Sequence, residues 1–154
     1  MSLLVERLVW KQTHYNREGT RMGDSLLARP LVPLADEADA ESTYSALVDH
    51  VDPASTHPVV IHVRTGMDDG RGSAALDRFE SLAAVDGMAV ETETYGGEDI
   101  TETIIDAATE TEASAIVFCS RGGSAWFDLL AGGVRSSLMA KSRRPVVMLP
   151  TDAD

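Results

Sequence analysis

The stretch "AIVFCSRGGSAWFDLLAGGVRSS", residues 115–137, joins an apolar run to a segment that carries two pairs of glycines. Its first part, "AIVFC", is continuously apolar, which is typical of a strand buried on both faces of a parallel sheet. Gly122 and Gly123 follow, and Gly132 and Gly133 come ten positions later. Glycines after a strand allow backbone amides to approach a phosphate, because they lack Cβ and adopt unusual φ angles. The stretch therefore predicts a buried strand that leads into either an anion-binding loop or a loop in which the glycines only turn the chain.

Patterns typical of strands and patterns typical of helices alternate along the rest of the sequence. Short apolar or β-branched runs predict strands at 30–34, 59–63, 88–95, 115–119 and 145–150, and amphipathic spacing predicts helices at 40–51, 76–85, 100–108 and 134–139. This alternation predicts an α/β fold, a single doubly wound five-stranded parallel sheet with helices on both faces. Ligands of such sheets bind at the carboxyl ends of the strands, near a topological switch point. The loop after residue 119 leaves the sheet at such an end.

Local signals refine three of these elements. Asp99 is placed to cap the third helix, and Glu102 three residues later completes a pattern like a capping box. Pro33 cannot donate to a neighbouring strand, so we expect it near the end of the first strand. Residues 88–95, "MAVETETY", alternate apolar and polar side chains, which predicts a half-exposed edge strand.

We expect residues 29–150 to form this domain, residues 1–28 to be an N-terminal extension and residues 151–154 to be a tail. The extension has no clean period, and its charge differs in sign from that of the remaining chain. Two interpretations of it stay open. It is a leader that precedes the domain, or an arm that packs on a partner subunit through Leu4, Leu8 and Trp10.

The charge of the chain argues against nucleic-acid binding. The 154 residues carry a formal net charge of -12. Residues 1–21 contain four basic and two acidic residues, so the remainder carries -14. A broad acidic surface repels a phosphate backbone. Many carboxylates with few lysines also resemble the composition of proteins from salt-loving organisms, in which salt screens the repulsion.

The sequence favours a cytoplasmic protein with no membrane contact. No apolar run approaches the roughly 18 residues of a membrane span, and Glu6 and Arg7 interrupt the N-terminus before a signal-peptide core forms. Cys119 is the single cysteine, which excludes an intrachain disulfide and agrees with a reducing compartment.

Residues 113–149 resemble the final third of the universal stress protein family, and the resemblance extends over residues 30–150. Family members typically carry a strand that ends in Gly, then Gly-x2-Gly-x9-Gly-(Ser/Thr), a helix and a final Pro-Val-aliphatic strand. The same spacing occurs here without a gap, at 119, 122, 132 and 133 and then at 145–147. The resemblance implies the strand order 3-2-1-4-5, a non-enzymatic regulatory role and the binding of ATP or AMP.

The residues at these positions depart from the family pattern. Cys119 occupies the position of the family's first glycine, and Gly133 occupies the position of its Ser or Thr. Ala35 stands where members carry an aspartate, with Asp36 one position later. A lost hydroxyl removes one charge-assisted hydrogen bond, about 1.5–3 kcal/mol, which is roughly ten- to a hundred-fold in affinity. We therefore expect weakened nucleotide binding. The residues that the resemblance places at the nucleotide are Asp36, Ser120, Arg121, Gly122, Gly123, Ser124, Gly132, Gly133 and Val134.

Three functions remain open at this point. The first is a non-enzymatic regulatory protein that binds an adenine nucleotide weakly at the Gly122–Gly133 loop. The second is a dimeric partner-interaction module that binds no nucleotide. The third is a weak nucleotide hydrolase, which the sequence disfavours because it has no G-x-S-x-G elbow and no P-loop lysine.

The sequence shows no metal site. The four histidines, His14, His50, His57 and His62, lack ligand spacing, and we expect His62, within a strand, to be structural. No metal is therefore expected among the cofactors.

The last strand predicts a homodimer. Val146–Leu149 contains no charge, and an exposed apolar edge invites pairing with another strand. The resemblance implies two-fold antiparallel pairing through this strand. The alternative is that residues 1–21 fold back over the edge and leave a monomer.

The acidic balance predicts that salt stabilises the fold. Repulsion among the carboxylates is screened as the Debye length shrinks to about 3 Å at 1 M salt. We expect a higher melting temperature in molar KCl than in dilute buffer, measured by circular dichroism. Equal melting temperatures in both solutions would contradict the salt-adapted interpretation.

Overall fold

The computed structural model describes residues 26–64, 66, 70–119 and 135–150. Strands and helices alternate along this part of the chain, in the order β1 (Pro30–Pro33), α2 (Glu37–Val48), β2 (Val59–Arg64), α3 (Arg71–Asp86), β3 (Glu91–Gly96), α4 (Ile100–Glu110), β4 (Ala115–Cys119), α6 (Arg135–Lys141) and β5 (Val146–Leu149). The strands form one five-stranded sheet in the order β3-β2-β1-β4-β5, and every pairing is parallel. The predicted fold and strand order are confirmed.

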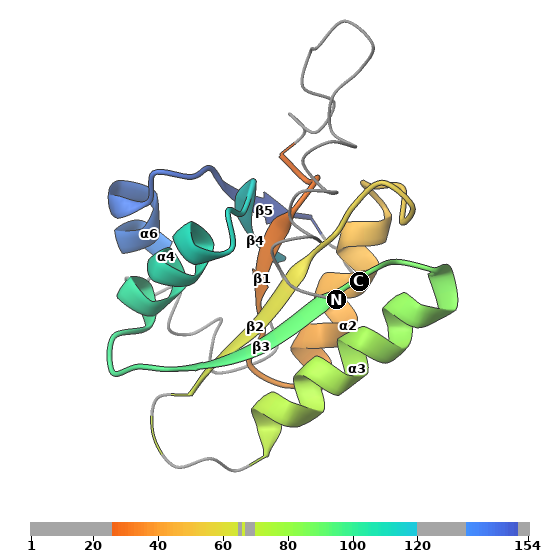
Figure 1. The fold of residues 1–154 in the computed structure, drawn as a ribbon, viewed down its shortest axis with the longest axis horizontal. Coiled ribbons are helices and arrows are strands. Elements are labelled where there is room, and N and C mark those ends of the chain that lie inside the picture. Colours follow the sequence, from red (N-terminus) through yellow and green to blue (C-terminus); the bar gives the residue numbers. More distant parts are fainter. Residues whose placement is uncertain (1–25, 65, 67–69, 120–134, 151–154) are drawn as a thin grey trace, which may run out of the picture.

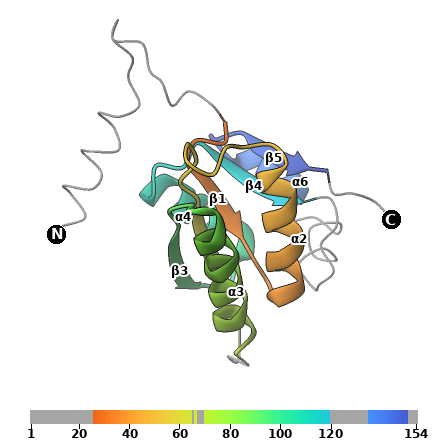
Figure 2. The ribbon, with the colours of Figure 1, turned by 90° about the vertical axis from the view of Figure 1, so that its right-hand side faces the viewer.

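Helices cover both faces of the sheet. Helices α2 and α3 lie on one face, and α4 and α6 lie on the other (Figures 1 and 2). Among the residues that the structure describes, no helix has the length and apolar character needed to cross a bilayer.

Side chains that alternate along the strands build a separate core on each face. Toward α2 and α3, Val32, Val60 and Val117 pack with Leu47 and Phe79. Toward α4 and α6, the neighbouring strand positions Leu31, Ile61, Ile116 and Phe118 pack with Ile104 and Leu138. Strands β1, β2 and β4 supply both cores, which explains their apolar sequences.

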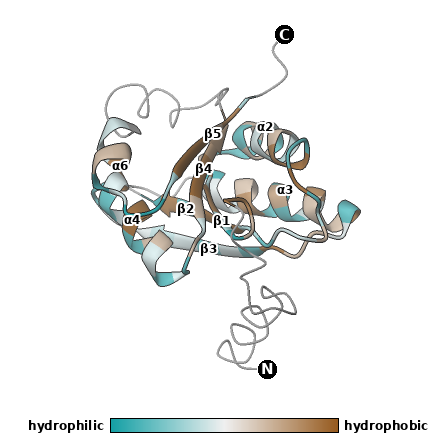
Figure 3. Cartoon of the chain, turned by 90° about the horizontal axis from the view of Figure 1, so that it is seen from above, coloured by the Kyte–Doolittle hydropathy of each residue, from teal (hydrophilic) through white to brown (hydrophobic). Residues whose placement is uncertain are grey.

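Strand β3 is the polar edge of the sheet. It pairs with β2 alone among the described strands, as predicted for an edge strand. All its residues are exposed except the half-buried Tyr95. Figure 3 shows it paler than the strongly hydrophobic β4 and β5. Glutamates and threonines on an edge strand discourage pairing with other chains.

The predicted cap of α4 is present. The backbone N–H of Glu102 donates to the Asp99 carboxylate at 3.1 Å. Several predicted boundaries were wrong. Helix α2 runs from Glu37 to Val48 rather than from residue 40 to 51, α3 begins at Arg71 rather than at residue 76, and β3 begins at Glu91 rather than at residue 88. Met88 instead packs into the core next to α3. It is apolar because it is buried there, and not because it belongs to the strand.

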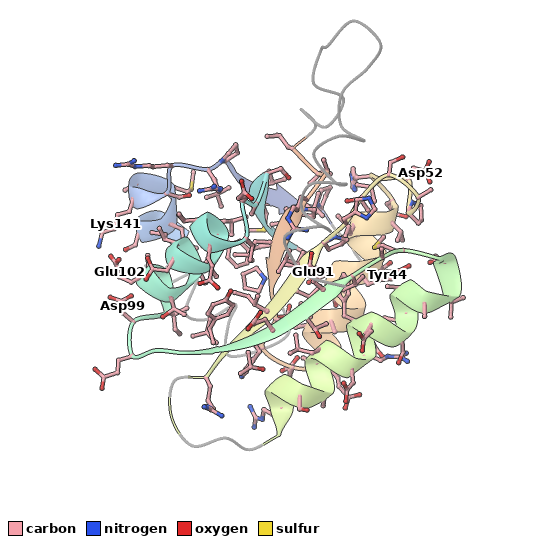
Figure 4. All side chains as sticks on the ribbon, in the orientation of Figure 1. Tyr44, Asp52, Glu91, Asp99, Glu102 and Lys141 are labelled. Carbon is pink, nitrogen blue, oxygen red and sulfur yellow. The ribbon has the colours of Figure 1, made fainter. Side chains whose placement is uncertain are left out.

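Two arginines bind carbonyl groups just beyond the C-terminus of α4. Arg29 is buried, and its Nε donates to the carbonyl oxygen of Thr111 at 2.9 Å. A second nitrogen of the same guanidinium group, Nη1, lies 2.7 Å from Oε2 of Glu91 on β3 (labelled in Figure 4). Arg144 donates from Nε to the carbonyl oxygen of Ala113 at 2.7 Å. Helix α4 has no basic residue in its own last turn, so these arginines supply the positive charge that a helix C-terminus favours.

The imidazole of His62 on β2 holds a fixed orientation under α3. Its Nδ1 lies 2.8 Å from the carbonyl oxygen of Leu34, and because a carbonyl only accepts, Nδ1 donates. Gly72 in the first turn of α3 is buried. A Cβ at Gly72 would lie 2.1 Å from Cδ2 and 2.6 Å from Nε2 of His62. The close approach of α3 to β2 therefore requires glycine at this position.

Gly72→Ala is expected to destabilise the fold, because the added methyl group overlaps an imidazole that is held by Leu34. We expect a loss of about 1–3 kcal/mol in the free energy of unfolding, as for other overpacked cores. Urea unfolding followed by circular dichroism measures it.

Gly96→Ala is the matched control, because a Cβ at Gly96 meets nothing within 4 Å. The control is expected to stay within about 0.5 kcal/mol of the wild type, as most surface substitutions do. Equal losses in both variants would contradict the packing account of Gly72.

Candidate functional site

The carboxyl ends of β1 and β4 meet at the point where the strand order reverses. The chain leaves β1 toward β2 and β3 on one side, and it later returns to build β4 and β5 on the other side. The register of β1 with β4 consists of the pairs Pro30–Ala115 and Leu31–Ile116, whereas the pairing of β1 with β2 continues to Pro33 and Ile61. Pro33 has no N–H to donate. Since switch points of this kind hold ligands in open α/β sheets, this edge is the candidate site.

Asp36 begins α2 at this edge. It is extended, and its Oδ1 accepts the backbone N–H of Asp39 at 2.9 Å, which makes it the N-cap. The carboxylate is half-buried. Of the residues that the sequence predicts at the nucleotide, Asp36 is the one that the structure describes. The others, Ser120, Arg121, Gly122, Gly123, Ser124, Gly132, Gly133 and Val134, lie outside the described residues.

Asp39 is a buried carboxyl group that sequence reasoning missed. It is 6% exposed, and its Oδ2 accepts the backbone N–H of Ala35 at 2.9 Å. Ala35 lies two residues after the end of β1, so Asp39 connects the start of α2 to the segment that leaves this strand. The signal in the sequence was the spacing Asp39–Thr43, which puts two polar side chains one turn apart on the helix face that carries Ala40 and Leu47.

Thr43 and Cys119 extend this contact to β4. The side chains of both residues are buried, and Thr43 Oγ1 donates to Cys119 Sγ at 3.4 Å. Cys119 is the last residue of β4. Asp39, Thr43 and Cys119 therefore connect the carboxyl ends of β1 and β4, and we call them the Asp39 network.

Burial raises the pKa of Asp39 from 3.8 to about 6. The hydrogen bond from Ala35 opposes this effect, the nearby charge of Asp36 adds to it, and a hydrogen bond with Thr43 opposes it. The helix N-terminus also favours the ionised form, typically by about 0.3–1 kcal/mol. Desolvation is larger than these opposing effects, so Asp39 titrates near neutral pH.

The sequence profile of the universal stress protein family matches residues 23–150. The chain belongs to the universal stress protein family. No match was found among curated protein sequences.

Solved universal stress proteins share the fold. One from Burkholderia pseudomallei is 24% identical, with a TM-score of 0.62 over 82% of this chain and 98% of that chain. One from Archaeoglobus fulgidus is 20% identical, with a TM-score of 0.60 over 79% of this chain and 97% of that chain. A third, solved in complex with cAMP, is 15% identical, with a TM-score of 0.61 over 83% of this chain and the whole of that chain.

The raised pKa of Asp39 predicts a pH-dependent stability. Below about pH 3 the group is mostly protonated in the folded and the unfolded chain. As pH rises from about 4 to 6, the folded protein holds the proton more tightly, so the free energy of unfolding falls by about 3 kcal/mol and stays low above that range. Asp39→Asn removes this loss and keeps an oxygen for the Ala35 amide. The gain of the variant relative to the wild type is expected to be small at pH 4 and to reach about 3 kcal/mol above about pH 6.

Urea unfolding over this pH range measures the difference. Glu41→Gln is the control, because Glu41 lies on the same helix but is exposed, with its Oε2 2.8 Å from Nε of Arg78. Parallel stability profiles for the wild type and Asp39→Asn would show that Asp39 does not titrate in this window.

Proposed function

We propose that this chain is a non-enzymatic regulatory protein of the universal stress type that binds an adenine nucleotide, ATP or AMP, with weak affinity. The nucleotide lies at the carboxyl ends of β1 and β4, over the loop from Gly122 to Gly133 and beside Asp36. The proposal includes the cytoplasmic location that the single cysteine favours.

The observation that carries the proposal is the switch point between β1 and β4. The strand order reverses there, the paired register of the two strands ends early, and the glycine-containing segment begins directly after β4. Backbone amides of such a segment suit an anionic phosphate. A structural neighbour of this family was solved with cAMP, which supports a nucleotide as the ligand class.

The regulatory, non-enzymatic part of the proposal rests on the chemistry available in the chain. The sequence has no nucleophile elbow and no P-loop lysine. Within the described ranges, no three His, Cys, Asp or Glu side chains gather in a way that could hold a metal ion. We therefore propose that the site binds and orients a ligand without transferring protons or phosphoryl groups to it.

Thermal unfolding with and without ATP or AMP tests the proposal. A ligand at about 100 times its Kd adds about 2.7 kcal/mol to the free energy of unfolding, which corresponds to a Tm increase of roughly 5–10 °C for a chain of this size. We expect this increase at millimolar nucleotide. The absence of any shift would favour the interaction module that binds no nucleotide.

Gly133→Ser is expected to tighten nucleotide binding by roughly ten-fold, because it restores a hydroxyl donor to the phosphates. Isothermal titration measures the Kd. Gly96→Ser, at the end of the edge strand β3, is the matched control and is expected to leave the Kd unchanged. Unchanged affinity in Gly133→Ser would place the ligand elsewhere.

A dimer through β5 is the second proposed function, and the edge of β5 favours it. β5 pairs with β4, and no other described strand pairs with its outer side. Val146, Val147 and Met148 are partly exposed. Arg144, which precedes the strand, binds Ala113 and Thr109, so its charge does not oppose pairing at the edge of β5. A two-fold contact between two such strands closes after two subunits.

Light scattering is expected to give a dimer at micromolar concentration and high salt. Val147→Asp puts a charge at the centre of the pairing, and Met148→Pro removes a backbone donor, so both are expected to shift the protein toward monomer. Circular dichroism confirms that the variants fold. A monomeric wild type would rule out this assembly.

A further inference from the structure

The Asp39 network joins the two strands that flank the candidate site. Asp39 Oδ2 accepts the backbone N–H of Ala35, two residues after β1, at 2.9 Å. One helical turn later, Thr43 reaches Sγ of Cys119 at the end of β4, at 3.4 Å. All three side chains are buried. A single buried carboxyl group is thus connected to the backbone after β1 and, through Thr43, to the last side chain of β4.

The charged surroundings of Asp39 are mostly acidic. The ionisable groups on the elements around it are the N-cap Asp36, Glu37, Glu41 and Tyr44 on α2, Arg71, Asp77, Arg78, Glu80 and Asp86 on α3, His62 and Arg64 on β2, and Cys119 on β4; β1 and β5 carry none. Arg78 pairs with Glu41, and the Tyr44 hydroxyl pairs with Asp86. Among the described residues, Asp36 is the charged group that shifts the pKa of Asp39.

The protonation state of Asp39 sets the direction of the hydrogen bonds through Thr43. A hydroxyl has one proton to donate. When Asp39 is ionised, the Thr43 proton is drawn to the carboxylate, and the thiol of Cys119 is left to donate to Thr43 Oγ1. When Asp39 takes up a proton, its O–H donates to Thr43 Oγ1, and the Thr43 proton turns to Sγ of Cys119. The amide of Ala35 keeps its acceptor in both states.

We propose that Asp39 is a positioning residue through which pH controls nucleotide binding at this edge, with tighter binding in acid. The inference rests on the proposed nucleotide-binding function. Asp39 acts through its charge and through its contacts with Ala35, Thr43 and Cys119, and it does not itself touch the ligand.

The direction follows from charge. An ionised Asp39 beside Asp36 places two carboxylates at the start of α2, and these like charges oppose a nucleotide phosphate bound at this edge. Protonation removes one of the two charges. Because the coupling is reciprocal, a bound nucleotide also raises the pKa of Asp39, so binding near pH 6 takes up protons.

The experiment uses cAMP as the probe, because its phosphodiester keeps one charge throughout this pH range. Isothermal titration of the full chain is performed at about pH 5 and pH 7.5, on either side of the transition, at the lowest salt that keeps the protein folded. We expect the wild type to bind cAMP about three- to ten-fold more tightly at the lower pH. Asp39→Asn is expected to bind with the tighter affinity at both values. Glu41→Gln is expected to behave as the wild type.

A second measurement needs no variant. Titration of the wild type near pH 6 in buffers of different ionisation enthalpy reports proton uptake, and we expect net uptake on binding. Binding that is independent of pH, without proton uptake, would overturn this inference and leave the proposed function standing. A pH dependence that persists in Asp39→Asn would overturn it as well. No binding of cAMP, ATP or AMP at either pH would instead overturn the proposed function on which it rests.

Discussion

A buried guanidinium at the amino-terminal edge of the sheet determines how the strands line up. Arg29 precedes β1 and bonds to Glu91 at the start of β3 and to Thr111 before β4. Its backbone also exchanges hydrogen bonds with Ser114, whose Oγ lies 2.9 Å from the Arg29 nitrogen. Burying a charge is costly unless its donors are bonded, so these partners must be present together. With the amino ends held in this way, parallel strands bring their carboxyl ends to one common edge.

The buried charged groups at the amino ends and at the carboxyl ends of the strands have different partners. Arg29 has a carboxylate partner, and arginine stays charged under all ordinary conditions. Asp39 at the opposite edge has an amide, a hydroxyl and a second carboxylate around it, but no cation among its described partners. Its proton equilibrium therefore moves into the neutral range. The permanent charge of Arg29 lies at the amino ends, where it helps to set the strand register. The titratable group of Asp39 lies at the carboxyl ends, where ligands of this fold class bind.

The sequence predicted the fold because the buried strands depend on few distant partners. The run at 115–119 is apolar throughout, the run at 59–63 is apolar except for His62, and both became interior strands. The capping signal of Asp99 also needs only its own helix. Arg29 and Asp39 were not predictable in this way. The partner of Arg29, Thr111, is far away in the sequence. The partners of Asp39 are local, but its burial depends on how α2 packs on the sheet. Of the candidate site, the sequence identified Asp36, and the remaining predicted residues stay predictions.

The contact between His62 and Gly72 has a consequence for the evolution of the family. The two residues share one fixed volume between β2 and α3, with the imidazole on one side and the missing Cβ on the other. A larger side chain at position 72 fits only if position 62 becomes smaller or the helix moves away from the sheet. Neither position is therefore free to change alone. Across relatives that keep this spacing of helix and sheet, side-chain size at the two positions should covary inversely, as a record of the distance between the layers.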